Sequence, residues 1–281
     1  MIMKTINIKG ELLDLSMPVV MGILNVTPDS FFEGSRKETE QQIIDRVNEI
    51  LNQGGAIIDI GGQSTRPTST LISAQEEIER LKFALAVINR EFPETILSVD
   101  TFYSDVARFC VEEHGVAIVN DISGGEIDKE MFKTVANLNV PYVLMHMRGT
   151  PQTMTAMTDY DNLIQDIFYY FSKKIAELHL HGVNDVIIDP GFGFSKTLDQ
   201  NYELMASLNG FSIFEMPLLV GISRKKMISG LLDTTPAESL NGTTILNAFA
   251  LQNGANILRV HDVKEAVEAI KITKKILSFC Q

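Results

Sequence analysis

The sequence predicts an α/β protein, a single (β/α)8 TIM barrel, for three reasons. Eight short runs of apolar and mainly β-branched residues alternate with segments of helical length. The runs are almost continuously apolar, which is typical of parallel strands that are buried on both faces. Polar or charged residues stand at the end of the runs, and the active site of a barrel lies where its strands end.

The polar strand ends can be read off the sequence in chain order. They are Asn25, Thr65 and Arg66, Asp100, Asn120 and Asp121, His146, Asp189, Ser223 and Lys225, and Arg259 and His261. Helical periodicity is clear in residues 74–92, 159–181 and 263–279. Residues 1–18 precede the first strand, and we expect them to form a short hairpin or lid with KGE as its turn.

The domain organisation follows from length and composition. A chain of 281 residues is close to the usual size of one α/β barrel, and no Pro/Gly/Ser-rich linker divides it. We therefore expect one domain over residues 1–281. An open doubly wound sheet is the alternative, but no G-x-G-x-x-G motif follows the first strand to support it.

The charge balance limits the partners. A formal net charge of −12 argues against nucleic acid or a membrane surface, although a few cations in a cleft can still bind an anionic small molecule. The first residues lack the apolar core of a signal peptide, and no run approaches the ~20 apolar residues of a membrane span. Cys110 is expected to be a buried apolar residue. These features predict a cytoplasmic protein that acts on small molecules.

Two strand-to-helix loops, 27–39 and 62–73, are longer than packing requires, and loops of this kind usually bind or cover a substrate. Other features are weak. GFGFSKT (191–197) lacks the spacing of a phosphate-binding loop, and no Cys/His cluster has metal-ligand spacing. His146 stands between two methionines and is expected either to pack in the barrel or to lie beside a ring-binding wall formed by Met145.

Three residues suit a polar planar ring. The carboxylate of Asp189 precedes a Pro-Gly turn, where it could accept two parallel N–H groups from a guanidine-like edge. Asn120 offers a donor and an acceptor for the remaining edge. Asp100 has a second interpretation as a helix cap, because Thr101 follows it.

Cations stand at other strand ends. Arg259 and His261, two residues apart on one strand, are expected to point the same way. Together with nearby hydroxyl groups they could bind a diphosphate, and Asn25 could share Mg²⁺ with it. Arg224 and Lys226 beside Lys225 are interpreted as solvated or helix-adjacent charges.

Several motifs resemble those of the dihydropteroate synthase family. They are NVTPDSF (25–31), DIGGQSTRP (59–67), SVDTF (98–102), VNDISGG (119–125), LMHMRGTPQTM (144–154), IIDPGFGFSKT (187–197), GISRK (221–225) and RVHDV (259–263). The match runs through nearly the whole chain in order, and NVTPDSF together with GG-x-STRP is specific. The resemblance implies a cytoplasmic, usually homodimeric barrel enzyme of folate biosynthesis and a target of sulfonamides.

The resemblance also implies a reaction and roles for residues. The (7,8-dihydropterin-6-yl)methyl group would pass from its diphosphate to 4-aminobenzoate. The pterin site would comprise Asp100, Asn120, Met145, Asp189, Lys225 and Arg259, with Asp100, Lys225 and Arg259 also catalytic. Asn25, Arg259 and His261 would hold the diphosphate, Asn25 through Mg²⁺. The 4-aminobenzoate site would comprise Thr65, Arg66, Pro67, Phe194 and Ser223.

Departures from the family pattern affect the loops. Gln63, Thr68 and Ser195 stand where Glu, Gly and Gly are frequent, and FFEGS (31–35) replaces a frequent SDGG. Two alternatives share part of the pattern: a pterin-binding methyltransferase domain and a catalytically silent pterin-binding paralogue. The methyltransferase would need neither STRP nor ISRK, and the silent paralogue could lose Asn25, Arg66 or Lys225, yet all of these are present.

Overall fold

A computed structural model describes residues 4–26, 36–64 and 69–279. Its centre is a sheet of eight strands, every neighbouring pair of which is parallel. The strands are β3 (Val19–Asn25), β4 (Ile57–Gly61), β5 (Ile96–Asp100), β6 (Ile118–Asp121), β7 (Tyr142–Met145), β8 (Val186–Asp189), β9 (Leu219–Val220) and β10 (Ile257–Val260). A parallel bridge between Ile188 and Leu218 joins the two outer strands. The sheet closes into the predicted TIM barrel, and the open-sheet alternative is wrong.

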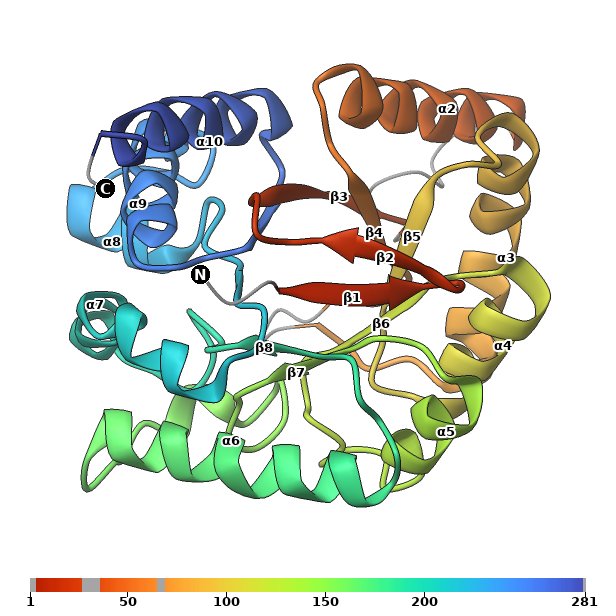
Figure 1. Cartoon of the computed structure of the whole chain (residues 1–281). Helices are drawn as coiled ribbons and strands as arrows, with labels where there is room; N and C mark the ends of the chain where they lie inside the picture. The colour runs from red at the N-terminus through yellow and green to blue at the C-terminus, as the bar shows by residue number, and fades with distance from the viewer. Residues whose placement is uncertain (1–3, 27–35, 65–68, 280–281) are drawn as a thin grey trace.

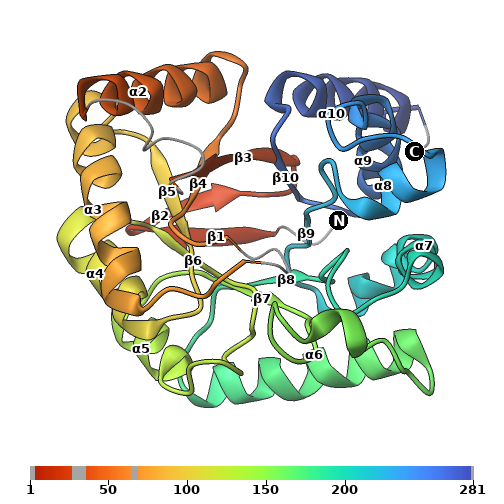
Figure 2. The ribbon, with the colours of Figure 1, turned by 180° about the vertical axis from the view of Figure 1, so that it is seen from behind.

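Helices surround the barrel (Figures 1 and 2). The structure describes α2 (Arg36–Asn52), α3 (Ala74–Glu91), α4 (Ser104–His114), α5 (Met131–Leu138), α6 (Leu163–Leu180), α7 (Leu198–Ala206), α8 (Lys226–Leu232), α9 (Leu240–Gln252) and α10 (Val263–Leu277), with the short 3-10 helices η1 (Met154–Ala156) and η2 (Leu208–Phe214). Helix α3 begins where predicted, because Ser73 and Glu76 form a capping box.

Helix α6 begins four residues later than its periodicity predicts. The side chain of Asn162 accepts a hydrogen bond from the backbone N–H of Gln165, so it caps the helix at that point. The sequence pattern extends through residues 159–162 only because their side chains continue the helical repeat. A side-chain cap therefore outweighs periodicity in setting this boundary.

Two strands are shorter than predicted. β4 ends at Gly61, so Thr65 and Arg66 do not belong to it. β9 consists of two residues, and Ser223 and Lys225 lie in the loop that follows it. The backbone of Arg224 adopts the left-handed conformation, with φ 56°, which extended strands do not contain.

The barrel interior has an apolar layer and a polar layer, because side chains alternate between the two faces of each strand. The apolar layer lies at the amino ends of the strands. It contains Met21, Ile57, Ile118, Val143, Ile187, Leu219 and Ile257. Further along the same strands the inward positions carry Asp59, Asn120, Asp189 and Arg259, which form the polar layer.

An antiparallel hairpin, β1 (Thr5–Ile8) and β2 (Glu11–Asp14), closes the amino end of the barrel. Figure 1 shows it lying across this end. Ile6 and Leu15 pack against the apolar layer. Asn256 joins the hairpin to the barrel: its Nδ2 donates to the Leu15 carbonyl and its Oδ1 accepts from the Leu218 N–H. The hairpin therefore lies at the end opposite the polar layer.

No helix in the described part of the chain is both long enough and apolar enough to cross a membrane. Cys110 is fully buried in α4, as predicted, and burial raises the pKa of its thiol. This thiol is therefore an apolar packing group.

Candidate active site

The polar layer centres on Arg259. Its Nε donates to Asp59 Oδ2 and its Nη2 donates to Asp100 Oδ2, each at 2.6 Å. Asn120 Nδ2 also donates to Asp59 Oδ2, at 2.9 Å. Strands β4, β5, β6 and β10 thus bring four polar side chains together from distant parts of the sequence. Asp59 Oδ1 is buried and has no partner among the described residues, so this acceptor is available to a ligand N–H.

Burial dominates the electrostatics of this cluster. It raises the pKa of Asp100, the Arg259 cation lowers it, and the Asp59 carboxylate raises it again. Burial also opposes the charge on Arg259, but Asp59 and Asp100 raise the pKa of Arg259 overall. A buried cation held between two carboxylates offers a pre-arranged field to a polar ligand.

Asp59 is the site residue that the motif analysis overlooked. It lies inside β4, two residues before the strand ends, and its side chain is fully buried. The available signal was a charged residue within an otherwise apolar strand, because such a residue is costly to bury without a partner. The sequence instead placed the polar end of this strand at Thr65 and Arg66.

Asp189 lies at the end of β8 beside a loop that also organises Lys225. Asp189 Oδ1 accepts from the Gly191 N–H at 2.8 Å, and burial raises the pKa of this carboxyl group. Lys225 Nζ donates to the Phe192 carbonyl and lies 4.6 Å from the centre of the Phe194 ring. Burial lowers the pKa of Lys225 to about 8, an effect that the Asp189 carboxylate opposes.

An apolar wall borders these groups. Met145 is buried at the end of β7 and packs in a cluster with Phe102, Ile122, Met147 and Met154, against which Phe194 also packs. His146 is buried next to it, which confirms the interpretation of this residue as a packed barrel residue. Burial and the neighbouring Lys196 and Arg148 cations hold the pKa of His146 well below its usual range.

Asn25 and His261 line an open depression at the rim of the barrel, together with Arg46, Arg224 and Asp262. The Ser223 hydroxyl accepts from the His261 N–H at 3.1 Å and lies 3.1 Å from His261 Nδ1. The side chain of Arg259 instead reaches into the barrel to Asp59 and Asp100. The Arg259 side chain therefore lies deep in the barrel, whereas His261 lies at its rim.

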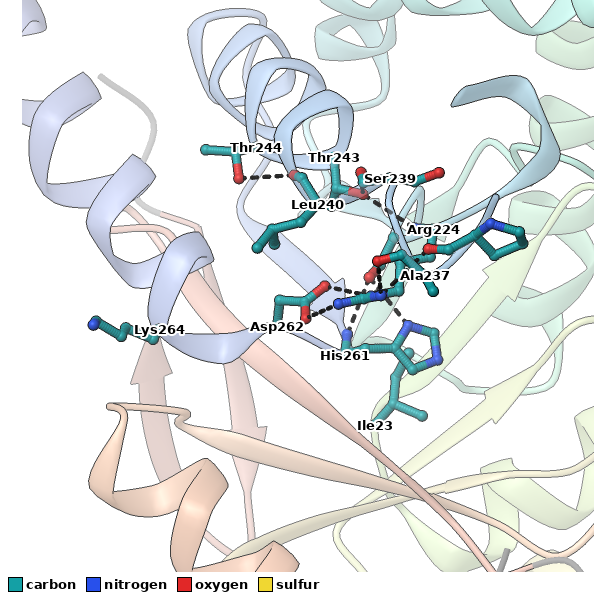
Figure 3. A network of polar contacts seen from close by, with 12 residues as sticks. Ile23, Arg224, Ala237, Ser239, Leu240, Thr243, Thr244, His261, Asp262 and Lys264 are labelled. Atoms are coloured by element: carbon teal, nitrogen blue, oxygen red, sulfur yellow. Dashed lines mark hydrogen bonds and ion pairs between the residues drawn. The ribbon is translucent and has the colours of Figure 1, made fainter. Parts of the chain in front are cut away.

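Arg224 is a fixed part of this rim, and it stands two residues before α8 and pairs with the N-cap residue of α10, as its interpretation as a helix-adjacent charge predicts. Its Nε and Nη2 donate to the two carboxylate oxygens of Asp262 at 2.9 and 2.7 Å, and its Nη1 donates to the Ala237 carbonyl (Figure 3). The planar guanidinium suits this paired geometry. Arg224 thereby joins the loop that carries Ser223 and Lys225 to the start of α10.

Asn25 is the residue of the rim that suits Mg²⁺. Its amide is a neutral oxygen donor, it is exposed at the end of β3, and it faces the depression. The described residues contain no group of three or more His, Cys, Asp or Glu side chains that could hold a metal ion. One protein ligand fits Mg²⁺ only if phosphate oxygens and water complete its shell. The donor set therefore fits a cation that arrives with a diphosphate.

Some of the expected site lies outside the described residues. This applies to Thr65, Arg66, Pro67 and the departure at Thr68, and to residues 27–35 of the first long loop with its FFEGS segment. Gln63 is described: its Oε1 accepts from the Ile72 N–H at 2.7 Å. This bond joins the two sides of the second long loop at its base.

The departure at Ser195 has a structural explanation. The residue has φ 45°, a left-handed conformation that glycine adopts at little cost. Its hydroxyl accepts from the Arg148 N–H at 3.0 Å, and its carbonyl accepts from the Tyr160 hydroxyl. Compared with glycine, the serine adopts this left-handed backbone at a higher energetic cost, but its hydroxyl gains a hydrogen bond from the loop after β7.

We expect Ser195→Ala to be less stable than Ser195→Gly by about 1 kcal/mol. Both variants lose the hydroxyl, but only glycine relieves the left-handed backbone. Urea unfolding of the two variants and the parent chain measures the difference. An alanine variant that is as stable as the glycine variant would contradict the backbone explanation.

Glu77 is a buried carboxyl group that contacts the site from behind. It lies in α3, and its Oε2 accepts from the Thr101 hydroxyl at 3.0 Å, directly after Asp100. Its Oε1 is buried without a partner among the described residues. Burial raises the pKa of Glu77 to about 8, the Thr101 hydrogen bond lowers it, and Asp100 raises it.

A raised pKa in the folded state makes stability depend on pH. The pKa of Glu77 is 4.5 in the unfolded chain and about 8 in the folded protein, so the folded protein binds this proton more tightly. The contribution is fully present below pH 4.5 and is lost as pH rises to about 8, at about 1.4 kcal/mol per pH unit. We expect Glu77→Gln to remove this contribution. Urea unfolding from pH 5 to 8 tests it, and parallel curves for the two proteins would contradict it.

Comparison with known proteins agrees with this fold and shows a family. The family described as pterin binding enzyme matches residues 21–261. The Escherichia coli K12 dihydropteroate synthase is 42% identical over 272 residues, which cover 96% of this chain and 95% of the relative. A Yersinia pestis dihydropteroate synthase in a sulfonamide drug complex superposes with a TM-score of 0.90 at 39% identity, covering 98% and 99% of the two chains. A Xanthomonas albilineans dihydropteroate synthase with 4-aminobenzoic acid superposes with a TM-score of 0.88 at 34% identity, covering 98% of each of the two chains.

The barrel, its buried acid–arginine cluster and the family match define a pterin-binding enzyme. Sequence identity of 42% over almost the full length of both chains identifies one family within this class. The chain belongs to the dihydropteroate synthase family, whose members are enzymes of folate biosynthesis.

Proposed function

We propose that the chain, folded as one domain, transfers the (7,8-dihydropterin-6-yl)methyl group from its diphosphate to 4-aminobenzoate, giving 7,8-dihydropteroate and diphosphate. The observation that carries this proposal is the polar layer. It places Asp59, Asp100, Asn120, Asp189 and Arg259 at the carboxyl ends of the strands, next to the apolar wall at Met145. A polar ring with one apolar face fits this combination.

The pterin is assigned to the deep part of the site. Asp189 accepts the paired N–H groups of the pyrimidinone edge, while Asn120 and the unpartnered Asp59 Oδ1 serve the adjoining groups. Met145 forms an apolar wall and Arg259 covers the ring. Asp100 and Lys225 complete the contacts. The carboxylate of Asp100 favours positive charge on the ring as the reaction proceeds.

The departing diphosphate is assigned to the rim. His261 and Asn25 line the depression there, and Arg259, two residues before His261, points inward as part of the polar layer. Burial and the Arg259 cation lower the pKa of His261 to about 4, so its neutral ring would donate a hydrogen bond to the leaving group, and Arg259 would supply positive charge. Asn25 would hold Mg²⁺, which when bound neutralises diphosphate charge. The bond to the diphosphate then breaks before the neutral aniline nitrogen attacks the methylene carbon. The nitrogen releases one proton to solvent after the new C–N bond forms, so it needs little general-base help at pH 7.

The second substrate is assigned to the space nearest Phe194 and Ser223. Phe194 lies beside Lys225, so an aromatic acid here would be next to the methylene carbon of the pterin. Ser223 lies between this space and His261. Thr65, Arg66 and Pro67 are assigned to the same subsite on their motif. The dihydropteroate synthase solved with 4-aminobenzoic acid supports this choice of substrate.

The test is diphosphate release from the pterin diphosphate, with and without 4-aminobenzoate and Mg²⁺. We expect dihydropteroate only when all three are present. Scrambling of the bridging oxygen in labelled diphosphate without 4-aminobenzoate would support bond breaking before attack. Absence of product under full conditions would overturn the assignment, and strict dependence of bond cleavage on 4-aminobenzoate would overturn the order of steps.

We further propose that the enzyme works as a cytoplasmic homodimer. Helices α8, α9 and α10 lie side by side (Figures 1 and 2). They carry exposed apolar side chains. These include Leu231, Leu232, Ile245, Phe249, Ile272 and Ile276. A surface of this kind is typical of a contact between subunits. Sedimentation of the chain and of a variant with Ile245→Glu measures the state, and a monomeric parent chain would overturn this proposal.

A further inference from the structure

Lys196 is a buried lysine that the proposed reaction does not use. Lys196 is 8% exposed and directly follows the loop of residues 190–195. Lysine is almost never buried to this degree without partners. Burial lowers the pKa of Lys196 to about 7, against the effect of the Asp189 carboxylate and in the same direction as Lys225 and Arg148. The chain therefore keeps a costly group at this position.

The Lys196 Nζ contacts three acceptors. It lies 3.1 Å from His146 Nδ1, 2.9 Å from the Gly191 carbonyl and 3.0 Å from the Phe194 carbonyl. An ammonium group has three N–H donors and no acceptor, so these partners match its full capacity. Two of them belong to the 190–195 loop, and the third belongs to the residue after β7. The contact therefore joins the loop to the wall of the barrel.

The 190–195 loop has an unusual backbone that Lys196 holds together with other contacts, among them the hydrogen bond from the Gly193 N–H to Asn201 Oδ1 and that from the Tyr160 hydroxyl to the Ser195 carbonyl. Gly191 and Gly193 have φ 72° and 79°, and Ser195 has φ 45°, so three of its residues adopt a conformation that side chains disfavour. A Cβ on Gly191 would lie 2.1 Å from the His146 carbonyl oxygen, so the loop is pressed against that residue. A backbone of this kind persists only where its surroundings fix it.

This loop carries groups assigned to both substrates. Phe194 belongs to the proposed 4-aminobenzoate subsite, and the Phe192 carbonyl accepts from Lys225 Nζ. Asp189 stands at the strand end before the loop, where the β7–β8 pairing fixes its backbone, although its Oδ1 also accepts from the Gly191 N–H. A change in loop shape would thus displace Phe194 and Lys225 more than Asp189.

We propose that Lys196 is a positioning residue: its three hydrogen bonds hold the 190–195 loop against His146 and so aim Phe194 at the second substrate and Lys225 at the reacting centre. The inference deepens the proposed function and rests on it. A purely structural role would instead affect stability alone.

The test compares Lys196→Met with Lys4→Met. Methionine has a similar length and suits a buried site. Lys4 is a matched control, because it is also partly buried and hydrogen-bonded, to Asn256 Oδ1 at 3.2 Å, but lies at the opposite end of the barrel. Lys196→Met should raise the KM for 4-aminobenzoate about tenfold or more and lower kcat, with a smaller rise in the KM for the pterin diphosphate, because Lys225 also contacts the pterin on the proposed assignment. Lys4→Met should leave all three constants unchanged.

Hydrogen exchange supplies a readout that needs no turnover. Amides of residues 190–197 should exchange faster in the substrate-free Lys196→Met variant than in the parent or in Lys4→Met. Unchanged exchange there, or a loss of stability with an unchanged KM for 4-aminobenzoate, would overturn the inference. A parent chain that makes no dihydropteroate would instead overturn the proposed function, so the two failures are distinguishable.

Discussion

Replacing Asp189 by alanine is expected to weaken pterin binding on the order of a thousandfold. Two hydrogen bonds from a guanidine-like edge to a buried carboxylate are among the strong polar contacts in proteins, and their loss leaves the ligand donors unpaired. Isothermal titration with the pterin substrate or a non-reactive pterin measures the change directly. Because the carboxylate is 6% exposed, water can replace it only poorly.

A control on the same strand separates this effect from damage to the barrel. Asp185 stands immediately before β8, at its amino end, where its Oδ1 accepts from the Asn7 N–H of the hairpin. Asp185→Ala removes a carboxylate from the same segment without touching the polar layer. If Asp185→Ala weakened pterin binding as much as Asp189→Ala, Asp189 would have only a structural role.

The second large effect concerns Arg259. Arg259→Met should lower the free energy of unfolding by about 3–5 kcal/mol at pH 7, since it leaves the buried carboxylates of Asp59 and Asp100 without their cation. Activity should fall below detection, because the same guanidinium serves the ring and the departing group. Urea unfolding and steady-state turnover measure the two losses.

A double variant tests the reason for the stability loss. Asp59→Asn with Arg259→Met should recover part of the unfolding free energy, because one unpaired carboxylate is replaced by a neutral amide. Asn120 Nδ2 would still need an acceptor, which the new amide oxygen can supply. Purely additive losses would show that Arg259 stabilises the barrel by packing rather than by its charge. Turnover should not recover in either case.

The sequence predicts the fold well because its main signals are local. Apolar strand runs and helical repeats reflect burial that every strand and helix experiences alike. The alternation of side chains also explains why the expected strand-end residues Asp100, Asn120 and Asp189 were brought together. Among the boundaries that differ, the start of α6 depends on a single cap at Asn162, and β9 ends at Val220, four residues before the left-handed backbone of Arg224.

The partners of the site residues could not be predicted in the same way. The Asp59–Arg259 pair joins residues 200 positions apart, and its members follow no common motif. Arg224 and Lys226 are two positions apart in sequence, but Arg224, whose backbone is left-handed, pairs with Asp262, whereas Lys226 begins α8. Lys196 is one of 24 lysine and arginine residues, and only the contacts of its Nζ distinguish it. Such pairings arise from tertiary geometry alone.

The hairpin of β1 and β2 has a kinetic consequence. Because it seals the amino end of the barrel against the apolar layer, every ligand that reaches Asp59 must pass the opposite mouth. On the proposed assignment the pterin occupies the inner position and 4-aminobenzoate the outer one. Loading is therefore sequential, and an occupied outer position traps whatever lies beneath it. An aromatic acid that cannot react should therefore slow the dissociation of the pterin. The hairpin, by closing one end of the barrel, would lengthen the time for which the first substrate stays bound.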